Sequence, residues 1–526
     1  MVHAKPAIPA GHGEVLTLPA FDLWAGMARA NHEKASEWAF EVSGRPAADV
    51  RALARREALR AASAFSAKLG VSVADAGSSD ELIVATGHQP ELYHPGVWIK
   101  DFLLQNLAER TGATAFDLVV DTDGFDALAV SAPCMTPGIQ RCRQYLAIGG
   151  PDAYYAGSPV PDSSALNDFC SAADAMLSSL SAPAVRHHFS AFCEQLRGAT
   201  QVADNLAELV TIARRRYEAA AGTNYLELPM THLASTESFG LFVADLVLNA
   251  ERFAAAYNAE LDEYRSANKV RSAVQPFPDL GSVAGRIELP LWVFRDGART
   301  TAWSEPAAGG TTRLVTDNGD LLAELPSAGD GAVAALRESG VVVAPKALAL
   351  TLFARLFTCD LFIHGVGGGR YDRVTDGVCR RYYHVEPPTF VVASITMYLP
   401  LGARIVTEDE VSAAKERINR LAHNPDALLG EVEFDSPQEQ SRAAALAAEK
   451  SSLVVDIEQF DADKKTIGRR IREVNAELAD LLSPLRTGME AELASLQVQL
   501  EASEILTDRT YPFCFWSPQE VADKAS

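Results

Sequence analysis

The sequence predicts an α/β protein with a Rossmann-like parallel-sheet core, helical and mixed insertions, and a C-terminal α-helical coiled coil. Three observations support this prediction. Residues 81–120 carry a strand–helix–strand pattern, and residues 357–383 repeat a strand–loop–helix pattern around a glycine-rich segment. Near the C-terminus, apolar residues recur every seven positions from 446 to 481, which is typical of a coiled coil.

The first strand–helix–strand unit begins with the apolar run 81–86, which ends at Gly87 and predicts a buried strand followed by a turn. Residues 97–109 place apolar side chains at helical spacing, and Thr111-Gly112 ends that helix. Residues 116–120 form the next apolar run. Because such units connect parallel strands by a right-handed crossover, both strands should lie in one parallel sheet.

The rest of the chain divides by composition. Residues 161–224 are rich in alanine, serine and charge at helical spacing, whereas residues 296–340 are rich in glycine, threonine, alanine and aspartate. We therefore expect a core assembled from residues 1–160, 225–295 and 341–403, a helical insertion at 161–224, a small connecting insertion at 296–340, and coiled-coil helices with a C-terminal tail at 404–526. Strand candidates in the later parts are residues 225–229, 286–294 and 357–363, and residues 371–383 predict a helix.

The C-terminal heptads indicate coiled-coil helices. The residues that fall seven apart are Leu446, Leu453, Phe460, Ile467, Val474 and Leu481. Ser436 and Glu439 form a capping-box pattern just ahead of them. Two arrangements fit equally well: an intramolecular hairpin with an earlier helix at 408–423, or the seam of a homodimer.

Composition limits the function classes. The formal net charge of −22 argues against nucleic acid or an anionic membrane as the main partner, because both require a basic surface. The seven cysteines include no CxxC pair, which favours free, buried thiols over disulfides or structural zinc. The N-terminus lacks the pattern of a signal peptide, and no stretch of 18 apolar residues occurs. We expect a cytoplasmic protein.

The first candidate site is the segment Thr86–Gly96, which joins the first strand to its helix. Open α/β sheets bind ligands at the carboxyl ends of parallel strands. Pro95 suits the first helical position, so His94 should be the N-cap residue beside free N–H groups that attract anions. His88 and His94 are therefore candidate catalytic residues, with Gly87 and Gln89 as substrate-binding candidates. Alternatively, both histidines only cap backbone groups.

The second candidate site follows the second strand. In an extended strand, Asp121 and Asp123 would point to the same side. Two adjacent carboxylates repel each other, so a substrate amine or Mg²⁺ would satisfy them. We interpret Asp123 as a catalytic candidate and Asp121 as a substrate-binding one. The alternative is a solvated acidic turn that uses Gly124.

The third candidate site is the glycine-rich segment after residue 363. Its glycines allow a close approach of the backbone to a ligand and a nest of N–H groups. Arg370 and His364 could bind a carboxylate or phosphate. The segment lacks the GxGxxG pattern, which disfavours NAD or FAD. The candidates are His364, Gly365, Gly367, Gly368, Gly369, Arg370 and Tyr371. The alternative is tight packing of a helix on a strand.

Taken in order, these segments resemble the cysteine-adding ligase family of bacillithiol biosynthesis. A strand ending in Thr86-Gly87, followed by a glutamine, a Pro-Gly turn and a helix that carries Lys100, is similar to the N-terminal core of that family. Residues 286–297, ending in Phe-Arg-Asp-Gly, and the glycine segment 364–371 also resemble it, as do the C-terminal heptads. The chain departs from the family pattern at His88, where the family has glutamine, and at Arg370.

The resemblance implies condensation of cysteine with a sugar-derived amine in the synthesis of a low-molecular-weight thiol. It also implies a dimer through the coiled coil and a substrate-binding role for Lys100. Amide formation requires an activated carboxylate, and ATP or ADP with Mg²⁺ is the candidate cofactor. No recognised ATP motif is present, so the donor stays open. The competing hypotheses are a nucleotidyl- or glycosyl-type transferase on the same core, and a non-catalytic binding protein that acts through its coiled coil.

Overall fold

A computed structural model describes most of the chain, in two compact units. The described residues are 7–134, 139–272, 274–275, 277–295, 297–327, 330–402, 404–459 and 463–526. Unit 1 comprises residues 1–134, 142–399 and 509–526, and unit 2 comprises residues 135–141 and 400–508. Two residues used in the sequence argument, Phe460 and Asp296, lie outside the described residues.

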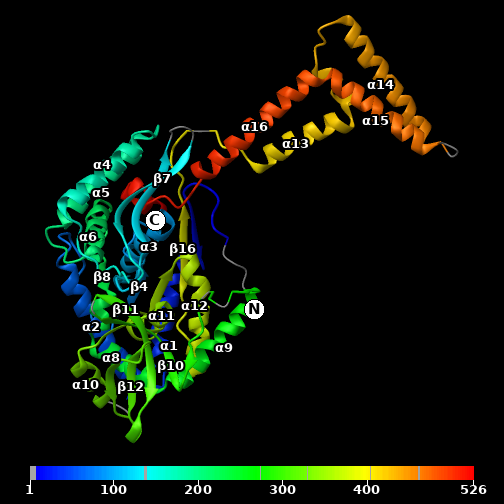
Figure 1. The fold of residues 1–526 in the computed structure, drawn as a ribbon. Coiled ribbons are helices and arrows are strands. Elements are labelled where there is room, and N and C mark those ends of the chain that lie inside the picture. The colour runs from blue at the N-terminus through cyan, green and yellow to red at the C-terminus, as the bar shows by residue number, and fades with distance from the viewer. Residues whose placement is uncertain are drawn as a thin grey trace. The chain divides into compact units, whose positions relative to one another are not determined.

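Unit 1 is built on a six-stranded sheet that is parallel except at one edge (Figure 1). Its strands, in sheet order, are β1 (Glu14–Leu18), β16 (Val391–Thr396), β15 (Leu361–His364), β4 (Ile83–His88), β5 (Thr114–Val119) and β8 (Leu226–Pro229). Only β1 pairs in the antiparallel sense. The chain adds strands outward from β4 to β8 and then places β15 on the other side of β4, so the strand order reverses between β4 and β15.

Every residue of β5, β15 and β16 is buried, as expected for parallel strands that are covered on both faces. The predicted strand–helix–strand unit is confirmed, because α3 (Pro95–Thr111) connects β4 to β5 and packs against both. Further helices around the sheet are α1 (Trp24–Ala35), α2 (Ala47–Ser66), α11 (Ala347–Phe353), α12 (Val366–Val378) and α17 (Pro518–Ala525). The structure corrects the strand predicted at 357–363: residues 354–358 form a π-helix, and β15 begins only at Leu361.

The predicted helical insertion is present as α4 (Ser163–Leu177), α5 (Pro183–Ala199) and α6 (Leu206–Glu218). It is preceded by a two-stranded sheet of β6 (Ala127–Cys134) and β7 (Gln140–Ile148). Cys134 and Cys142 form a disulfide there, so the prediction of free thiols was wrong for these two cysteines. The pairing of β6 with β7 brings the two together, and their sequence spacing does not reveal it. The other five cysteines are free and buried.

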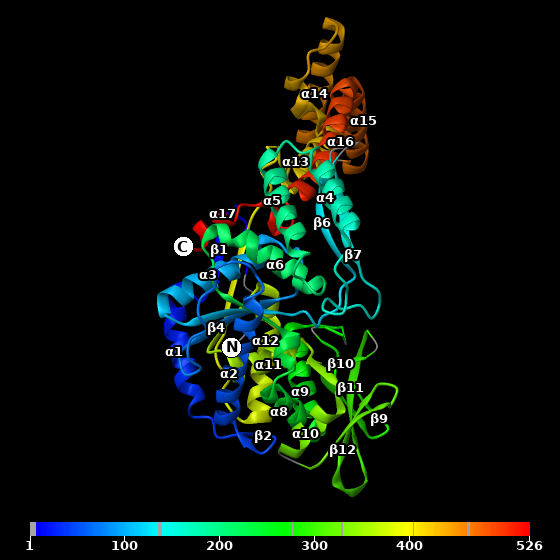
Figure 2. The same cartoon turned by 90° about the vertical axis from the view of Figure 1, so that its left-hand side faces the viewer.

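A second sheet, antiparallel throughout, occupies another part of unit 1 (Figure 2). Its strands are β9 (Ser282–Val283), β10 (Arg286–Arg295), β11 (Ala298–Pro306), β12 (Thr312–Thr316), β13 (Leu321–Leu325) and β14 (Val342–Pro345). Residues 286–295, expected in the core sheet, belong here, so the insertion predicted at 296–340 starts earlier and ends later. Associated helices are α7 (Met230–Ala234), α8 (Glu237–Leu248), α9 (Ala250–Asn268) and α10 (Asp330–Ser339).

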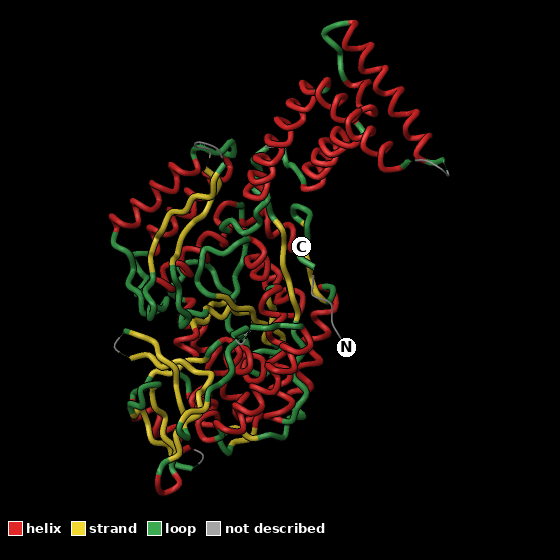
Figure 3. The backbone as a smooth tube through the Cα atoms, turned by 45° about the vertical axis from the view of Figure 1, so that its right-hand side comes forward, coloured by secondary structure: helices red, strands yellow, loops and turns green. Residues whose placement is uncertain are grey.

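Unit 2 is helical (Figure 3). Its long helices are α13 (Glu408–His423), α14 (Pro437–Ile457), α15 (Lys464–Leu481) and α16 (Ser483–Leu506). The predicted heptad run does not lie on one continuous helix, because the chain breaks between α14 and α15. Leu446 on α14 packs against Val474 and Leu478 on α15, so heptad positions expected on one helix face each other from two. The helix predicted at 408–423 is confirmed as α13, which packs against α16.

The heptads are therefore used within the chain, and a homodimer stays a prediction. The predicted tail 404–526 also needs correction, because residues 509–526 return to unit 1. Among the described helices, none has both the length and the apolar character needed to cross a membrane.

Candidate functional site

One cavity in unit 1 lies where the strand order of the parallel sheet reverses. Its volume is about 840 Å³. The segment after β4 and the segment after β15 both line it, although they are far apart in sequence. In open α/β sheets this reversal point is where ligands bind, because the connections leave on opposite faces and open a crevice. The structure thus brings the first and third predicted sites together.

Most of the predicted site residues line this cavity. They are Gly87, His88, Gln89, His94, Lys100, Asp123, His364, Gly365, Gly367, Gly368, Arg370 and Tyr371. Asp121 and Gly369 are not among the lining residues.

His94 is the N-cap residue of α3, as predicted. Its Nδ1 accepts a hydrogen bond from the backbone N–H of Gly96 at 3.0 Å, and Pro95 occupies the first helical position. A nitrogen that accepts this bond must be unprotonated, so His94 is held as the neutral form and its Nδ1 is committed to the cap. This geometry favours the alternative in which His94 caps the helix rather than acting as a base.

His88 is also a weak base. Its Nδ1 lies 3.1 Å from the backbone oxygen of Gln89, and its ring packs edge-on against Tyr93. Burial, assisted by the charge of Lys100, lowers the pKa of His88 to about 3. The imidazole is therefore neutral at physiological pH, and it can take part in hydrogen bonds but accepts a proton poorly.

Lys100 provides a buried cation at the cavity. Its side chain is 1% exposed, and Nζ donates to Thr86 Oγ1 and to the backbone oxygen of Gly87, each at 3.0 Å. An ammonium group has three protons, so one remains after these two bonds. No carboxylate of the described residues lies within 4.0 Å of Nζ. Burial lowers the pKa of Lys100, and an anionic ligand would favour its charged form.

The two aspartates of the second predicted site do not act together. β5 ends at Val119, so the alternation of a strand no longer applies at residues 121–123. Asp121 instead accepts hydrogen bonds from the backbone N–H and the hydroxyl of Thr231, at the start of α7. Asp123 accepts from Gln89 at 2.8 Å and pairs with Arg299 at 2.9 Å. The predicted shared amine or metal site is therefore not formed, and Asp123 is already neutralised.

The predicted glycine loop is a helix start. Gly365 is the N-cap residue of α12, and Gly367, Gly368 and Gly369 lie in its first turn with ordinary negative φ angles, so no nest is formed. A Cβ atom at Gly369 would lie 2.3 Å from Val392, so this glycine permits tight packing of α12 on the sheet. Gly365 and Gly367 would meet nothing within 4 Å. The helix therefore presents its positive end, without a side-chain cap, at the cavity.

His364, the last residue of β15, is held by Asp372 from α12. Its Nε2 lies 2.9 Å from Asp372 Oδ2, and the ring packs between Phe362 and Phe390. Asp372 also accepts from Thr351 and pairs with Arg355 at 2.5 Å. Burial opposes ionisation of Asp372, but Arg355 and His364 outweigh it and hold the pKa of Asp372 well below its usual range. The carboxylate is thus ionised and fixes the imidazole.

The charges around the cavity favour an anion. Arg370 stacks over Tyr371 with its guanidinium carbon 5.7 Å from the ring centre, and it makes no hydrogen bond or ion pair within the part of the chain that is described. Lys346 pairs with Glu288 at 2.9 Å. Lys100 and Arg370 therefore remain without a carboxylate partner, in a chain whose net charge is −22. Both side chains line the cavity, where they would attract an anionic ligand.

The sequence reasoning missed several lining residues that come from other parts of the chain. The apolar ones include Phe277, Trp292, Pro345, Leu348 and Phe362, and the polar ones include Lys346, Thr351, Asp372, Ser394 and Arg509. Arg509 donates to Ser394 Oγ and to the backbone oxygen of Ile395, each at 2.8 Å. Of these residues, only Asp372 could have been predicted from the sequence. It follows the glycines at a helical spacing that places its side chain near His364.

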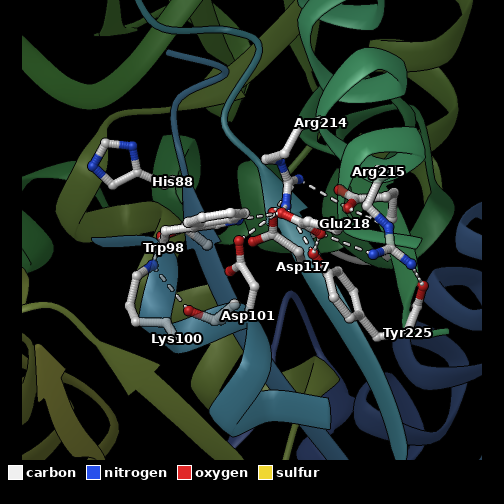
Figure 4. A network of polar contacts seen from close by, with 12 residues as sticks. His88, Trp98, Lys100, Asp101, Asp117, Arg214, Arg215, Glu218 and Tyr225 are labelled. Atoms are coloured by element: carbon white, nitrogen blue, oxygen red, sulfur yellow. Dashed lines mark hydrogen bonds and ion pairs between the residues drawn. The ribbon is translucent and has the colours of Figure 1, made fainter. Parts of the chain in front are cut away.

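A buried network of charges lies near Lys100 (Figure 4). Arg214 occupies its centre and binds Asp117 at 2.8 Å and Asp101 at 3.0 Å. The other members are Arg215, Glu218, Tyr225 and Glu227. Burial raises the pKa of Asp101 to about 8, against the charges of Arg214 and Lys100, which favour the ionised form. The network fixes α3 and α6 against β5 and β8 and so supports the wall that carries Lys100.

Comparisons with known proteins give no assignment. No family model matches the chain, and no curated protein matches it. Among solved structures, the chain is similar to tryptophanyl-tRNA synthetase from Plasmodium falciparum, with 9% identity, a TM-score of 0.23, and coverage of 81% of this chain and 83% of that one. A likeness at this level carries no argument about fold or function.

Proposed function

We propose that this chain is a ligase-like enzyme on a Rossmann-like core, a divergent relative of the cysteine-adding enzymes of bacillithiol biosynthesis. It would condense an amino acid, cysteine, with a sugar-derived amine. The observation that carries the proposal is the cavity at the reversal of strand order, which is lined by both segments on which the sequence resemblance rests.

The distribution of charge supports an anionic substrate. Lys100 on one wall and Arg370 with the start of α12 on the other would hold a carboxylate or phosphate group. The apolar wall, with Trp292 and Phe277, would bury the rest of the molecule. His88 and Gln89 would contribute hydrogen bonds rather than proton transfer.

The expected cofactors fit in part. The two cations and the helix N-terminus suit the phosphates of ATP or ADP, which would supply the activated carboxylate. The acidic residues do not suit Mg²⁺, because Asp123 is bound by Arg299 and Asp372 by Arg355. The described residues contain no group of three or more potential metal ligands. We therefore assign no metal ligands.

A ligand screen tests the proposal. Thermal unfolding is measured with cysteine, with glucosaminyl malate and with ATP, each alone and in combination, and product formation is followed by mass spectrometry. A ligand at about 100 times its dissociation constant stabilises the folded state by about 2.7 kcal/mol, which is readily detected. We expect stabilisation by cysteine or the amine, and an amide product when all three are present.

Arg370→Ala should remove the stabilisation by the anionic ligand, whereas Arg373→Ala, an exposed arginine on the same helix, should retain it. Stabilisation by nucleotides alone would favour the transferase hypothesis. The absence of any stabilisation would favour a non-catalytic binding protein, and either result would refute the ligase proposal.

A further inference from the structure

The three histidines at the cavity differ in which ring nitrogen is available. In His94, Nδ1 is used by the helix cap, and in His88, Nδ1 faces a backbone oxygen and burial suppresses protonation. In His364, Nε2 faces the ionised carboxylate of Asp372 and therefore carries a proton, which it donates. The neutral ring then has its lone pair on Nδ1.

Nδ1 of His364 has no hydrogen-bond partner among the described residues. Some unpaired polar atoms of the described residues, such as Trp38 Nε1 and Arg355 Nε, have almost no exposed surface. His364 Nδ1 does not belong to that group. The nitrogen is thus not completely enclosed. His364 and Gly368 both line the cavity, and Nδ1 is the ring nitrogen that lies beside Gly368.

Gly368 keeps that nitrogen open. A Cβ atom at this position would lie 2.9 Å from His364 Nδ1, closer than real contacts allow. Gly368 is in the first turn of α12 with an ordinary negative φ angle, so the backbone alone does not require glycine there. Glycine is required instead because a side chain at this position would clash with His364 Nδ1.

We propose that His364 is the general base of this site, that Asp372 is its positioning residue, and that Gly368 provides access to Nδ1. This inference rests on the proposed function, because the proton would come from the substrate's ammonium group. Nδ1 takes that proton, the amine keeps the electron pair, and the resulting imidazolium is stabilised by the Asp372 carboxylate. The neutral amine can then attack the acyl carbon of the carboxylate that ATP has activated, forming the C–N bond as the bond from that carbon to the phosphate or adenylate leaving group breaks.

The first test needs no substrate. Diethyl pyrocarbonate acylates unprotonated imidazole nitrogens, and peptide mass spectrometry gives the rate at each histidine. His364 should react in the wild type, and Gly368→Ala should slow that reaction by about tenfold or more, equivalent to a barrier of about 1.4 kcal/mol. Asp372→Asn should also slow it, because an amide NH₂ can donate to Nε2 and so favour the tautomer that carries its proton on Nδ1.

The matched control is Gly26→Ala. Gly26 is the third residue of α1, as Gly368 is of α12, and a Cβ atom there would meet nothing within 4 Å. This variant should leave the reactivity of His364 unchanged, and exposed His187 should react equally in all variants.

In the ligase assay, Gly368→Ala should lower kcat about tenfold or more with KM unchanged, whereas Gly26→Ala should change neither. An unreactive His364 in the wild type, or equal rates in the wild type and Gly368→Ala, would overturn the inference even if the enzyme proves to be a ligase. A reactive, Gly368-dependent His364 in a protein that forms no amide would instead refute only the ligase proposal.

Discussion

Asp121 was predicted to bind substrate, and a direct experiment can test whether its buried carboxyl instead affects only the stability of the fold. Burial raises the pKa of its carboxyl from 3.8 to about 7, against the hydrogen bonds from Thr231 that favour the ionised form. A raised pKa means that the folded state binds a proton that the unfolded state releases, so stability falls as pH rises from about 4 to about 7. Each pKa unit corresponds to about 1.36 kcal/mol, so the loss at Asp121 is about 4 kcal/mol.

Asp121→Asn removes this titration. The amide oxygen can still accept from the Thr231 N–H, but one of the two hydrogen bonds is weakened, at a cost of about 1 kcal/mol. We therefore expect the variant to be less stable than the wild type near pH 4 and more stable near pH 8, with the two stability curves crossing between. Other buried carboxyls, such as Asp101, titrate equally in both proteins and cancel in the difference.

Guanidinium unfolding followed by tryptophan fluorescence measures this difference in unit 1 alone, because all six tryptophans lie there. Asp152→Asn, at an exposed aspartate, is the charge-matched control. A stability difference between Asp121→Asn and the wild type that is constant from pH 4 to pH 8 would refute the argument, and so would loss of ligand binding at unchanged stability.

Three further predictions concern other parts of the chain. Asp360→Asn should lower the free energy of unfolding of unit 1 by about 3–5 kcal/mol, because Asp360 neutralises two buried arginines. Unfolding followed by tryptophan fluorescence measures this loss, and a loss below about 1 kcal/mol would contradict the prediction. Leu478→Ala should destabilise unit 2 by about 2–5 kcal/mol in circular dichroism and leave the tryptophan transition unchanged; a shift of both would show that the units unfold together. Alkylation of the unreduced, denatured protein should modify five cysteines, and labelling of Cys134 or Cys142 would exclude their disulfide.

The features of the fold that depend on local periodicity could be predicted from the sequence. The strand ending at Gly87, the helix with its His94 cap, and the later glycine segment all carry short-range signals, and the parallel topology then forces both segments to the same edge of the sheet. This is why the two distant segments, predicted as separate sites, line one cavity.

Contacts that depend on where a strand ends, or on pairing between distant segments, could not be predicted from the sequence. The argument for Asp121 and Asp123 assumed that alternation continues past Val119, and the chain turns there instead. Arg299, which neutralises Asp123, comes from the second sheet and has no sequence signal. The heptads failed for a similar reason: a seven-residue repeat is the same whether its positions lie on one long helix or face each other across a hairpin.

The path of the chain through unit 2 has a consequence for protein engineering. The chain leaves the core after Leu399 and re-enters it at Arg509, whose guanidinium binds Ser394 and Ile395 on the strand just before the exit. A C-terminal truncation at residue 400 would therefore also remove Arg509 from the cavity wall. An internal deletion within 400–508 would instead leave Arg509 and its two partners in the chain.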